Sequence, residues 1–321
     1  MRNLPLILDH VGVPPLKCQG IKTKLVRFIF QNIQWKASAG GRWIEPFLGS
    51  GVVALNLMPK SALLLDTNKH IIRFYNSLQN GDFEIDKTRN FLFQEGKRLA
   101  EVGADYYYEV RERFNAEGSS LDFLFLNRCC FNGVMRFNSK GKFNVPFGHK
   151  PERFSKAYIS KIVNQLSWAM KQIRGNDWEF RVGQWEEAFS EAKQRDFVYI
   201  DPPYVGRHTD YYNSWDESEA IKLAAITQQL SSGYALSMWY QNKYRKNHHI
   251  EQYWSNAEMR LCNHFYHVGS KESLRNAIEE ALLIKPGFAA PVSNQKINYH
   301  ETVRDLQLTF VMEKQRSYTN G

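Results

Sequence analysis

Short apolar runs that end at an acidic residue or a turn recur along this 321-residue chain, and helical patterns separate them. A short apolar run between turn residues is typical of a strand that is buried on both faces. Strands that alternate with helices favour an α/β domain with a mostly parallel sheet. The expected strands are residues 43–44, 62–65, 197–200, 234–238, 265–268 and 281–284, and the expected helices are residues 24–33, 52–57, 69–78 and 159–173.

The alternation breaks between residues 80 and 180, where the pattern is mainly helical. The exception is RFNSKGKFNV at 136–145, in which a turn signal separates two arms that each carry a phenylalanine, and this pattern predicts a β-hairpin. We therefore predict a discontinuous sheet domain made of residues 1–79 and 180–290, with an inserted domain at 80–179. Residues 291–321 are expected to form a peripheral extension without an assigned role.

The excess of basic over acidic residues is compatible with a protein that binds nucleic acid. Lys and Arg number 42 against 33 Asp and Glu, which gives a net charge of +9, and 14% of the residues are aromatic. Nucleic-acid-binding proteins have this composition, although many basic enzymes share it. No apolar run approaches the ~20 residues of a membrane helix, the first residues make a poor signal peptide, and the four cysteines form no CxxC pair. We expect a cytoplasmic protein with reduced thiols and no membrane partner.

Three polar sites follow three of the expected strands. The first is EPFLGSG at 45–51, whose glycines let the backbone turn sharply towards a ligand; a tight turn alone is the alternative. The second is Asp66, where a doubly wound fold places a carboxylate that binds ribose hydroxyls; an N-cap for the next helix is the alternative. The third is DPPY at 201–204, whose prolines keep the chain extended and leave an acid at the ligand-binding edge of the sheet.

FLGSG, Asp66 and DPPY in this order resemble the S-adenosylmethionine-dependent methyltransferases that modify amino groups of DNA bases. PLKCQGIK at 15–22 resembles the PFLKWAGGK segment of the Dam-like N6-adenine DNA methyltransferases, the D12 class or alpha group. FLNRCCFNGVMRFNSKGKFNVPFG at 125–148 is similar to the target-recognition stretch of this family, and FVYIDPPY at 197–204 is similar to its catalytic strand. The resemblance covers residues 15–285. It implies a Rossmann-like sheet with an inserted, mainly helical target-recognition domain, and site-specific methylation of adenine N6 in double-stranded DNA.

The resemblance also implies which residues form the cofactor site and the catalytic site. Lys22 would approach S-adenosylmethionine, Phe47 would pack on its methionine part, and Asp66 would bind its ribose hydroxyls. Asp201 and the Pro202 carbonyl would accept hydrogen bonds from the N6 amino group of a flipped-out adenine, on which Tyr204 would stack. S-adenosylhomocysteine would be the product, and the chemistry requires no metal. The expected cofactor residues are Lys17, Cys18, Lys22, Pro46, Phe47, Gly49, Gly51, Asp66 and Asp201, and the expected catalytic residues are Asp201, Pro202, Pro203 and Tyr204.

A basic segment is the expected DNA-binding surface. Between Arg128 and Lys156 there are seven basic residues and one acid, and phosphate contacts need such concentrated charge. Arg136 is the expected reader of a base, because arginine can donate two hydrogen bonds to guanine. Phe137 or Phe143 would be either a wedge between DNA bases or part of the hairpin core. The expected DNA contacts are Arg128, Asn132, Val134, Arg136, Asn138, Lys140, Lys142, Pro146, Lys150, Arg207, Lys243, Arg245 and Lys271.

The chain departs from the family pattern at three places. Cys18 stands where the family has Trp, Gly20-Ile21 replaces a double glycine, and His149-Lys150-Pro151 replaces the RYK of GATC-type members, so GATC recognition does not follow. The alternative functions are an N4-cytosine methyltransferase, an RNA or protein-glutamine methyltransferase, and a DNA-binding protein that has lost activity. A monomer suffices to methylate one strand at a time. A restriction–modification system with a cognate endonuclease, a phage and a solitary methylation system all fit the sequence.

Overall fold

The computed structural model describes the chain except for residues 1–3, 6, 36–39, 204–214, 266–276 and 292–321. The contacts divide the chain into one unit at Met1–Ala290 and a second at Pro291–Gly321. Only Pro291 of the second unit lies within the described residues, so the fold described below is that of the first unit.

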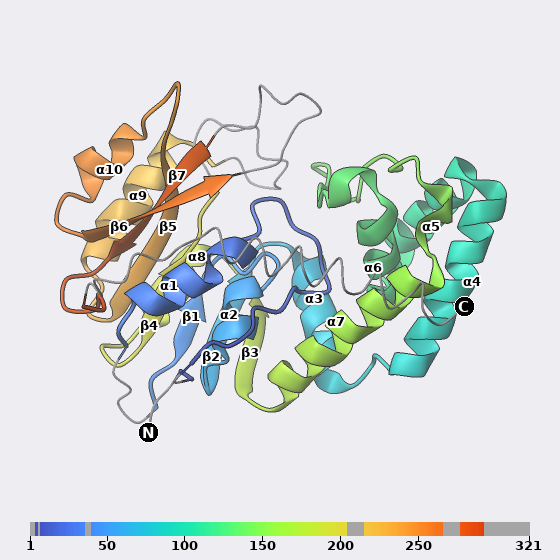
Figure 1. The fold of residues 1–321 in the computed structure, drawn as a ribbon, viewed down its shortest axis with the longest axis horizontal. Coiled ribbons are helices and arrows are strands. Elements are labelled where there is room, and N and C mark those ends of the chain that lie inside the picture. Colours follow the sequence, from blue (N-terminus) through green and yellow to red (C-terminus); the bar gives the residue numbers. More distant parts are fainter. Residues whose placement is uncertain (1–3, 6, 36–39, 204–214, 266–276, 292–321) are drawn as a thin grey trace, which may run out of the picture. The chain divides into compact units, whose positions relative to one another are not determined.

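Seven strands form one sheet in the described part of the chain. They are β1 (Trp43–Glu45), β2 (Ser61–Asp66), β3 (Asp177–Val182), β4 (Phe197–Ile200), β5 (Gly233–Asn242), β6 (Glu258–Phe265) and β7 (Ala277–Ile284). Their order in the sheet is β3-β2-β1-β4-β5-β7-β6 (Figure 1). The first five strands of this order are parallel, and β7 runs antiparallel to both β5 and β6. The order reverses between β1 and β4, which makes their carboxyl ends the expected position of a ligand site.

Helices cover both faces of this sheet. They are η1 (Thr23–Leu25), α1 (Val26–Asn32), α2 (Val52–Leu57), α3 (Lys69–Asn80), α8 (Trp185–Glu191), α9 (Glu217–Gln228) and α10 (His248–Tyr253). The helices α1, α2 and α3 share a hydrophobic cluster with Trp43 and Leu64, whereas α8, α9 and α10 share another with Ile44 and Leu63. Successive residues of a strand point to opposite faces, so these two clusters lie on opposite sides of the sheet. The unit is therefore a three-layer α/β/α fold, and the predicted Rossmann-like fold class is confirmed.

A group of helices lies between α3 and β3 in the sequence and beside the sheet in space (Figure 1). It consists of α4 (Ile85–Val102), α5 (Ala104–Glu117), α6 (Ser120–Cys129), η2 (Phe131–Gly133), η3 (Pro151–Arg153) and α7 (Lys156–Arg174), and we call it the helical lobe. α6 is at its centre, because every residue from Asp122 to Cys129 is buried. The helix α7 also packs against α3 and β3, so the lobe and the sheet share one core.

The predicted hairpin is present in a short form within the helical lobe. Phe137 and Phe143 pair in a single antiparallel bridge, and the Asn138 N–H donates to the Lys142 carbonyl at 2.9 Å. Both phenylalanines are buried, and Phe137 stacks on His70 with ring centroids 5.0 Å apart. Their burial favours the hairpin-core alternative over a wedge between DNA bases.

Both edge strands differ from the sequence expectations. The strand β3 was not predicted, because its residues alternate between exposed and buried and include charged side chains such as Glu179. The sheet also resumes at Asp177, three residues before the predicted boundary at 180. Of the strand predicted at 265–268, residue 265 ends β6 (Glu258–Phe265) and residues 266–268 lie outside the described part of the chain, whereas residues 258–264 were not predicted as strand.

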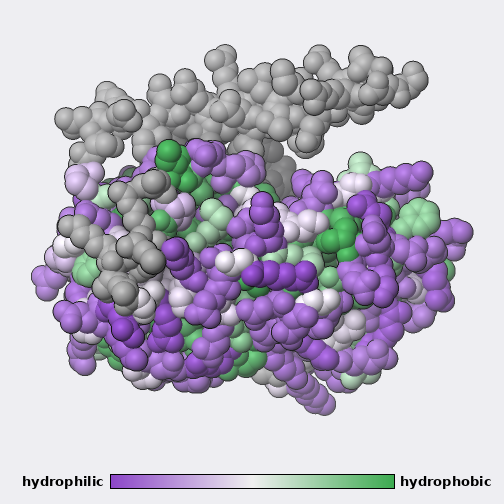
Figure 2. Space-filling model, turned by 90° about the horizontal axis from the view of Figure 1, so that it is seen from below, coloured by the Kyte–Doolittle hydropathy of each residue, from purple (hydrophilic) through white to green (hydrophobic). Residues whose placement is uncertain are grey.

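The surface seen in Figure 2 is mostly hydrophilic, with small, separate hydrophobic patches. Among the residues that the structure describes, no helix has the length and apolar character needed to cross a membrane.

Candidate active site

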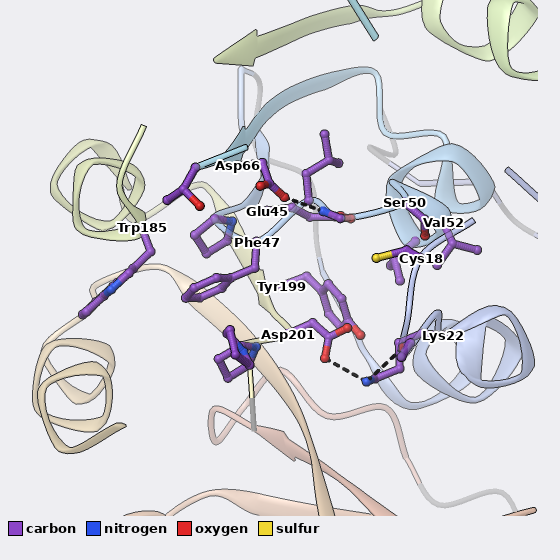
Figure 3. A pocket seen from close by; sticks show the side chains of 18 of the residues that line it. Cys18, Lys22, Glu45, Phe47, Ser50, Val52, Asp66, Trp185, Tyr199 and Asp201 are labelled. Carbon is purple, nitrogen blue, oxygen red and sulfur yellow. Dashed lines mark hydrogen bonds and ion pairs between the residues drawn. The ribbon is translucent and has the colours of Figure 1, made fainter. Parts of the chain in front are cut away.

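A cavity of about 240 Å³ opens where the parallel strands β1, β2 and β4 end. Each of these strands contributes an acid to the lining: Glu45 is the last residue of β1, Asp66 is the last residue of β2, and Asp201 follows β4. The carboxyl ends of neighbouring parallel strands meet at one edge of a sheet, and this explains why three acids that are distant in sequence share one cavity. Figure 3 shows Asp201 and Lys22 on one side of this cavity and Phe47 and Trp185 on another.

Asp66 holds together the two loops that follow β1 and β2. One of its carboxylate oxygens accepts a hydrogen bond from the Gly49 N–H at 2.8 Å, and the other accepts from the Asn68 N–H at 2.8 Å. Burial raises the pKa of Asp66, and these two hydrogen bonds oppose that rise. The N-cap of α3 is Asn68, whose side chain accepts from the His70 N–H, so the capping alternative for Asp66 is wrong.

The glycine turn between β1 and α2 leaves the cavity open on its backbone side. Gly49 and Gly51 have φ values of 52° and 64°, a left-handed conformation that glycine adopts without strain. A Cβ atom on Gly49 would have only the Cys18 Sγ atom within 4 Å, at 3.6 Å. A ligand can therefore approach the backbone at Gly49 closely.

Lys22 and Asp201 form an ion pair within the cavity. The Lys22 Nζ atom lies 2.9 Å from Asp201 Oδ1; the lysine is buried and the aspartate is partly exposed. Burial raises the pKa of Asp201, while the charge and the hydrogen bond of Lys22 lower it. The lysine therefore favours the ionised carboxylate, which is the form that accepts hydrogen bonds from an amino group.

Glu45 is a cavity residue that the sequence analysis did not select. It is buried, and its Oε1 atom accepts a hydrogen bond from the Trp43 indole N–H at 2.7 Å. Burial raises the pKa of Glu45 to about 8, against the effect of that hydrogen bond and with a further contribution from the charge of Asp201. Glu45 is therefore mainly protonated at neutral pH. Its position at the end of a strand, like that of Asp66, was the signal that could have identified it.

Aromatic side chains form another wall of the cavity. Phe47 stacks on Trp185 with ring centroids 6.4 Å apart and meets the edge of Trp215 at 5.4 Å. The Trp185 indole N–H donates to Glu219 at 3.1 Å, which fixes the orientation of this ring. Trp185 was not predicted as a site residue. It is the first residue of α8, which follows β3, and β3 itself was not predicted.

The comparisons with known proteins agree with this geometry. A family model described as "D12 class N6 adenine-specific DNA methyltransferase" matches residues 19–282. This chain belongs to that family. It is an adenine-specific DNA methyltransferase, of a family that uses S-adenosylmethionine as methyl donor.

Several curated proteins are similar to this D12-class methyltransferase. A DNA adenine methylase of Serratia marcescens is 33% identical over 228 residues, which cover 67% of this chain and 78% of that protein. The type II methyltransferase M.MjaIII of Methanocaldococcus jannaschii is 31% identical over 239 residues, covering 68% and 80%. A DNA adenine methylase of Escherichia coli is 28% identical over 278 residues, covering 82% and 93%.

Most of the predicted cofactor and catalytic residues of the D12-class methyltransferase meet at the cavity. Those in its lining are Cys18, Lys22, Pro46, Phe47, Gly49, Asp66, Asp201, Pro202 and Pro203. Gly51 is not in the lining and is instead the N-cap residue of α2. Tyr204 lies outside the described residues.

Lys17, a predicted cofactor residue, is not part of the cavity lining, and its role at the cofactor stays a prediction. Its backbone N–H and carbonyl pair with the side chain of Asn127. Its amine lies over the ring of Tyr158, 5.9 Å from the centroid, and burial lowers the pKa of this amine. Tyr158 belongs to α7, so Lys17 faces the helical lobe.

Two predicted DNA contacts of the D12-class methyltransferase are buried. Arg128 is 3% exposed, and its guanidinium donates hydrogen bonds to the Pro15 carbonyl and to Gln165. Val134 is 7% exposed and belongs to the hydrophobic core. Both side chains therefore lie within the helical lobe in this structure, and their contact with DNA stays a prediction.

Among the remaining predicted DNA contacts, some side chains form hydrogen bonds within the hairpin and others are exposed. The Arg136 guanidinium donates to the side chain of Asn144 at 3.0 Å and to its carbonyl at 3.2 Å, which orients it on the hairpin. The Asn138 side chain accepts from the Lys140 and Lys142 N–H groups and so closes the turn. Exposed positions are Asn132, Lys140, Lys142, Pro146, Lys150, Lys243 and Arg245, and Arg207 and Lys271 lie outside the described residues.

Phe131 is an exposed aromatic residue that the sequence analysis missed. It is 50% exposed and lies beside Asn132, which has a positive φ of 53°. Phe137 and Phe143 flank an obvious turn signal in the sequence, whereas no local pattern distinguishes Phe131. Within the described part of the chain, no group of three or more His, Cys, Asp or Glu side chains is arranged to hold a metal ion.

Proposed function

We propose that the cavity binds S-adenosylmethionine and that Asp201 holds the N6 amino group of a flipped-out adenine for methyl transfer. The observation that carries this proposal is the ion pair between Lys22 and Asp201 at the end of β4. The Asp201 carboxyl group lines the same cavity as the glycine turn and Pro202, whose backbone carbonyl is the second proposed acceptor, and this arrangement supports the proposal.

The lining has the chemistry that the cofactor requires. Phe47, on which Trp185 stacks, offers an apolar surface for its methionine part. Each carboxylate oxygen of Asp66 accepts one backbone hydrogen bond and keeps a lone pair that can accept from a ribose hydroxyl. The open backbone at Gly49 allows close approach of the methionine part, and Cys18 lies opposite the aromatic wall (Figure 3). When bound, the cofactor supplies a methyl group from its sulfonium centre, and the neutral thioether of S-adenosylhomocysteine is a good leaving group.

Asp201 and the Pro202 carbonyl would increase the reactivity of the adenine amino group. The lone pair of N6 is delocalised into the ring, so the nitrogen is a poor nucleophile. Two acceptors aimed at its N–H bonds favour a tetrahedral nitrogen and stabilise the positive charge that develops on it. Lys22 lowers the pKa of Asp201 and so favours its ionised form. Proline at position 203 favours an extended backbone. We propose that Tyr204, outside the described residues, stacks on the flipped base.

The helical lobe is the proposed target-recognition domain, at residues 80–179, and the peripheral extension proposed for residues 291–321 lies outside the described residues after Pro291. Arg136 is the proposed reader of a guanine, because Asn144 already orients its guanidinium. Exposed Lys140, Lys142 and Lys150 would contact phosphates. Lys243 and Arg245 form a second exposed basic surface beyond β5, and Arg207 and Lys271 complete the proposed set. We propose that the protein acts as a monomer, because one copy suffices to methylate one strand at a time.

The test is methyl transfer to DNA with a chemical readout. The protein is incubated with methyl-labelled S-adenosylmethionine and unmethylated plasmid DNA, and the nucleosides of a digest are identified by mass spectrometry. We expect N6-methyladenine, and single-molecule sequencing should find it at one recurring sequence. N4-methylcytosine, or labelled DNA without a recurring sequence, would contradict the proposed recognition.

A further inference from the structure

Two buried asparagines each form a pair of hydrogen bonds with the backbone of the N-terminal segment that leads into the cavity. Asn56 of α2 accepts a hydrogen bond from the Gly12 N–H at 2.7 Å and donates to the Gly12 carbonyl at 3.0 Å. Asn127 of α6 does the same at Lys17, with distances of 2.7 and 2.9 Å. We call residues 12–17 the strap. The sheet holds one end of the strap through α2, and the helical lobe holds the other end through α6.

The strap has little room to move independently of the helical lobe. A Cβ atom on Gly12 would lie 2.3 Å from the ring of Trp168 in α7, so the strap is packed closely against this helix. The buried Arg128, next to Asn127 on α6, donates a hydrogen bond to the Pro15 carbonyl. A shift of α6 would therefore carry the strap with it.

The strap connects the cofactor cavity to the loop at 131–134. On one side, Cys18 and Lys22 follow the strap directly and line the cavity, where Lys22 pairs with Asp201. On the other side, the Lys17 side chain lies under Gly133: a Cβ atom on Gly133 would be 2.6 Å from Lys17 Cδ. α6 itself ends at Cys129 and continues into this loop, which carries the exposed Phe131 and Asn132.

We infer that Asn127 is a positioning residue that couples recognition of the DNA sequence to cofactor binding. DNA bound at the loop and cofactor bound in the cavity would each stabilise the same position of the strap, the first through Gly133 and Lys17 and the second through Cys18 and Lys22. This inference rests on the proposed function. Because linkage between two sites is reciprocal, specific DNA must raise the affinity for cofactor by the same factor by which cofactor raises the affinity for specific DNA.

The experiment measures this factor. The dissociation constant of S-adenosylhomocysteine is determined by calorimetry with and without a saturating duplex that carries the methylated sequence. We expect a ratio of roughly 5 to 150 for the unaltered protein, the usual range for coupled sites. In the Asn127→Ala variant, the ratio should fall to about 2 or less, because Lys17 then loses both of its backbone hydrogen bonds to α6, and of the strap's described hydrogen bonds to this helix only that from Arg128 to the Pro15 carbonyl remains. Asn127→Ser, which keeps a polar group in the buried site, serves if the alanine variant does not fold, and it should also lower the ratio.

Asn115→Ala is a matched control, because Asn115 grips the backbone of Phe143 in the same way. Its side chain accepts from the Phe143 N–H at 2.7 Å and donates to the Phe143 carbonyl at 3.2 Å, but it does not contact the strap. This variant should bind DNA more weakly and keep the ratio of the unaltered protein.

The possible results separate the inference from the proposed function. If Asn127 had only a structural role, its variants would melt at a lower temperature or bind both ligands more weakly with an unchanged ratio, and the inference would be overturned. A ratio near 1 in the unaltered, active protein would overturn it as well. A protein that binds neither S-adenosylhomocysteine nor DNA would overturn the proposed function together with the inference.

Discussion

The Nζ atom of Lys22 lies 2.9 Å from Oδ1 of Asp201, so a lysine from the N-terminal segment pairs with the acid that follows β4. Burial raises the pKa of Asp201, and the interaction with Lys22 lowers it. The acidity of the proposed catalytic carboxylate therefore depends on a segment that only the tertiary structure brings to it.

Replacing Lys22 with methionine should move the acid limb of the pH–rate profile to higher pH. Without the lysine, burial acts on Asp201 with less opposition, so its pKa rises further and the carboxylate takes up a proton at a higher pH. The profile of kcat against pH for labelled methyl transfer measures the change. Lys161→Met, at an exposed position of α7, is the control and should keep the original profile. An unmoved acid limb in the Lys22→Met variant would show that this ion pair does not tune Asp201.

Asp201→Ala should abolish methyl transfer and leave DNA binding largely intact. The loss of one preorganised acceptor at the reacting nitrogen typically lowers the rate by ~100- to 1,000-fold. DNA binding rests on basic residues of the helical lobe, such as Lys140 and Lys142, which this change does not touch. Transfer rates and DNA dissociation constants are measured on the same preparation. Near-normal turnover would exclude the mechanism proposed for this carboxylate.

Glu45→Gln should stabilise the protein, and the gain should grow with pH. Burial raises the pKa of Glu45 to about 8 in the folded protein, whereas an unfolded chain releases this proton near pH ~4.3. Between these values the folded state holds a proton that the unfolded state has lost, so the free energy of unfolding falls as the pH rises through this window. At 1.36 kcal/mol per pKa unit, the upper limit of this cost is about 5 kcal/mol.

Urea unfolding at pH 5 and pH 8 measures the effect of Glu45. The glutamine oxygen can still accept from the Trp43 indole, so this hydrogen bond is retained in the variant. Glu101→Gln, at an exposed position of α4, should show no such pH dependence. A stability difference that is the same at both pH values would contradict the raised pKa.

Arg136→Ala should weaken discrimination at one base pair of the recognition sequence. A bidentate arginine contact with guanine contributes ~1–3 kcal/mol of specificity. Competition binding against duplexes with single substitutions measures this loss. Lys140→Ala is the comparison, because the loss of a phosphate contact should weaken binding to all sequences and lower the salt slope by ~1. An unchanged site preference in Arg136→Ala would remove Arg136 from base recognition.

The residues around the cavity illustrate what the sequence determined by itself. Asp66 and Asp201 each end an apolar run, and the glycines at 49 and 51 follow a third run, so their meeting at one edge followed from the geometry of parallel strands. The apolar runs are local and strong, because a strand that is covered on both faces must be apolar throughout. For this reason the central strands β1, β2 and β4 were predictable, whereas the half-exposed edge strands β3 and β6 were not.

Only the tertiary structure decided the role of individual charged and aromatic side chains. Lys17 and Lys22 are five positions apart in one basic segment, yet Lys22 enters the cavity and Lys17 faces the helical lobe. From the sequence, Arg128 was expected to contact DNA at the surface. In the structure the residues of α6 from Asp122 to Cys129 are buried, and Arg128 is buried among them. Whether such a side chain is exposed, paired or buried depends on packing between segments that are far apart in the chain, and no local pattern of residues records that packing.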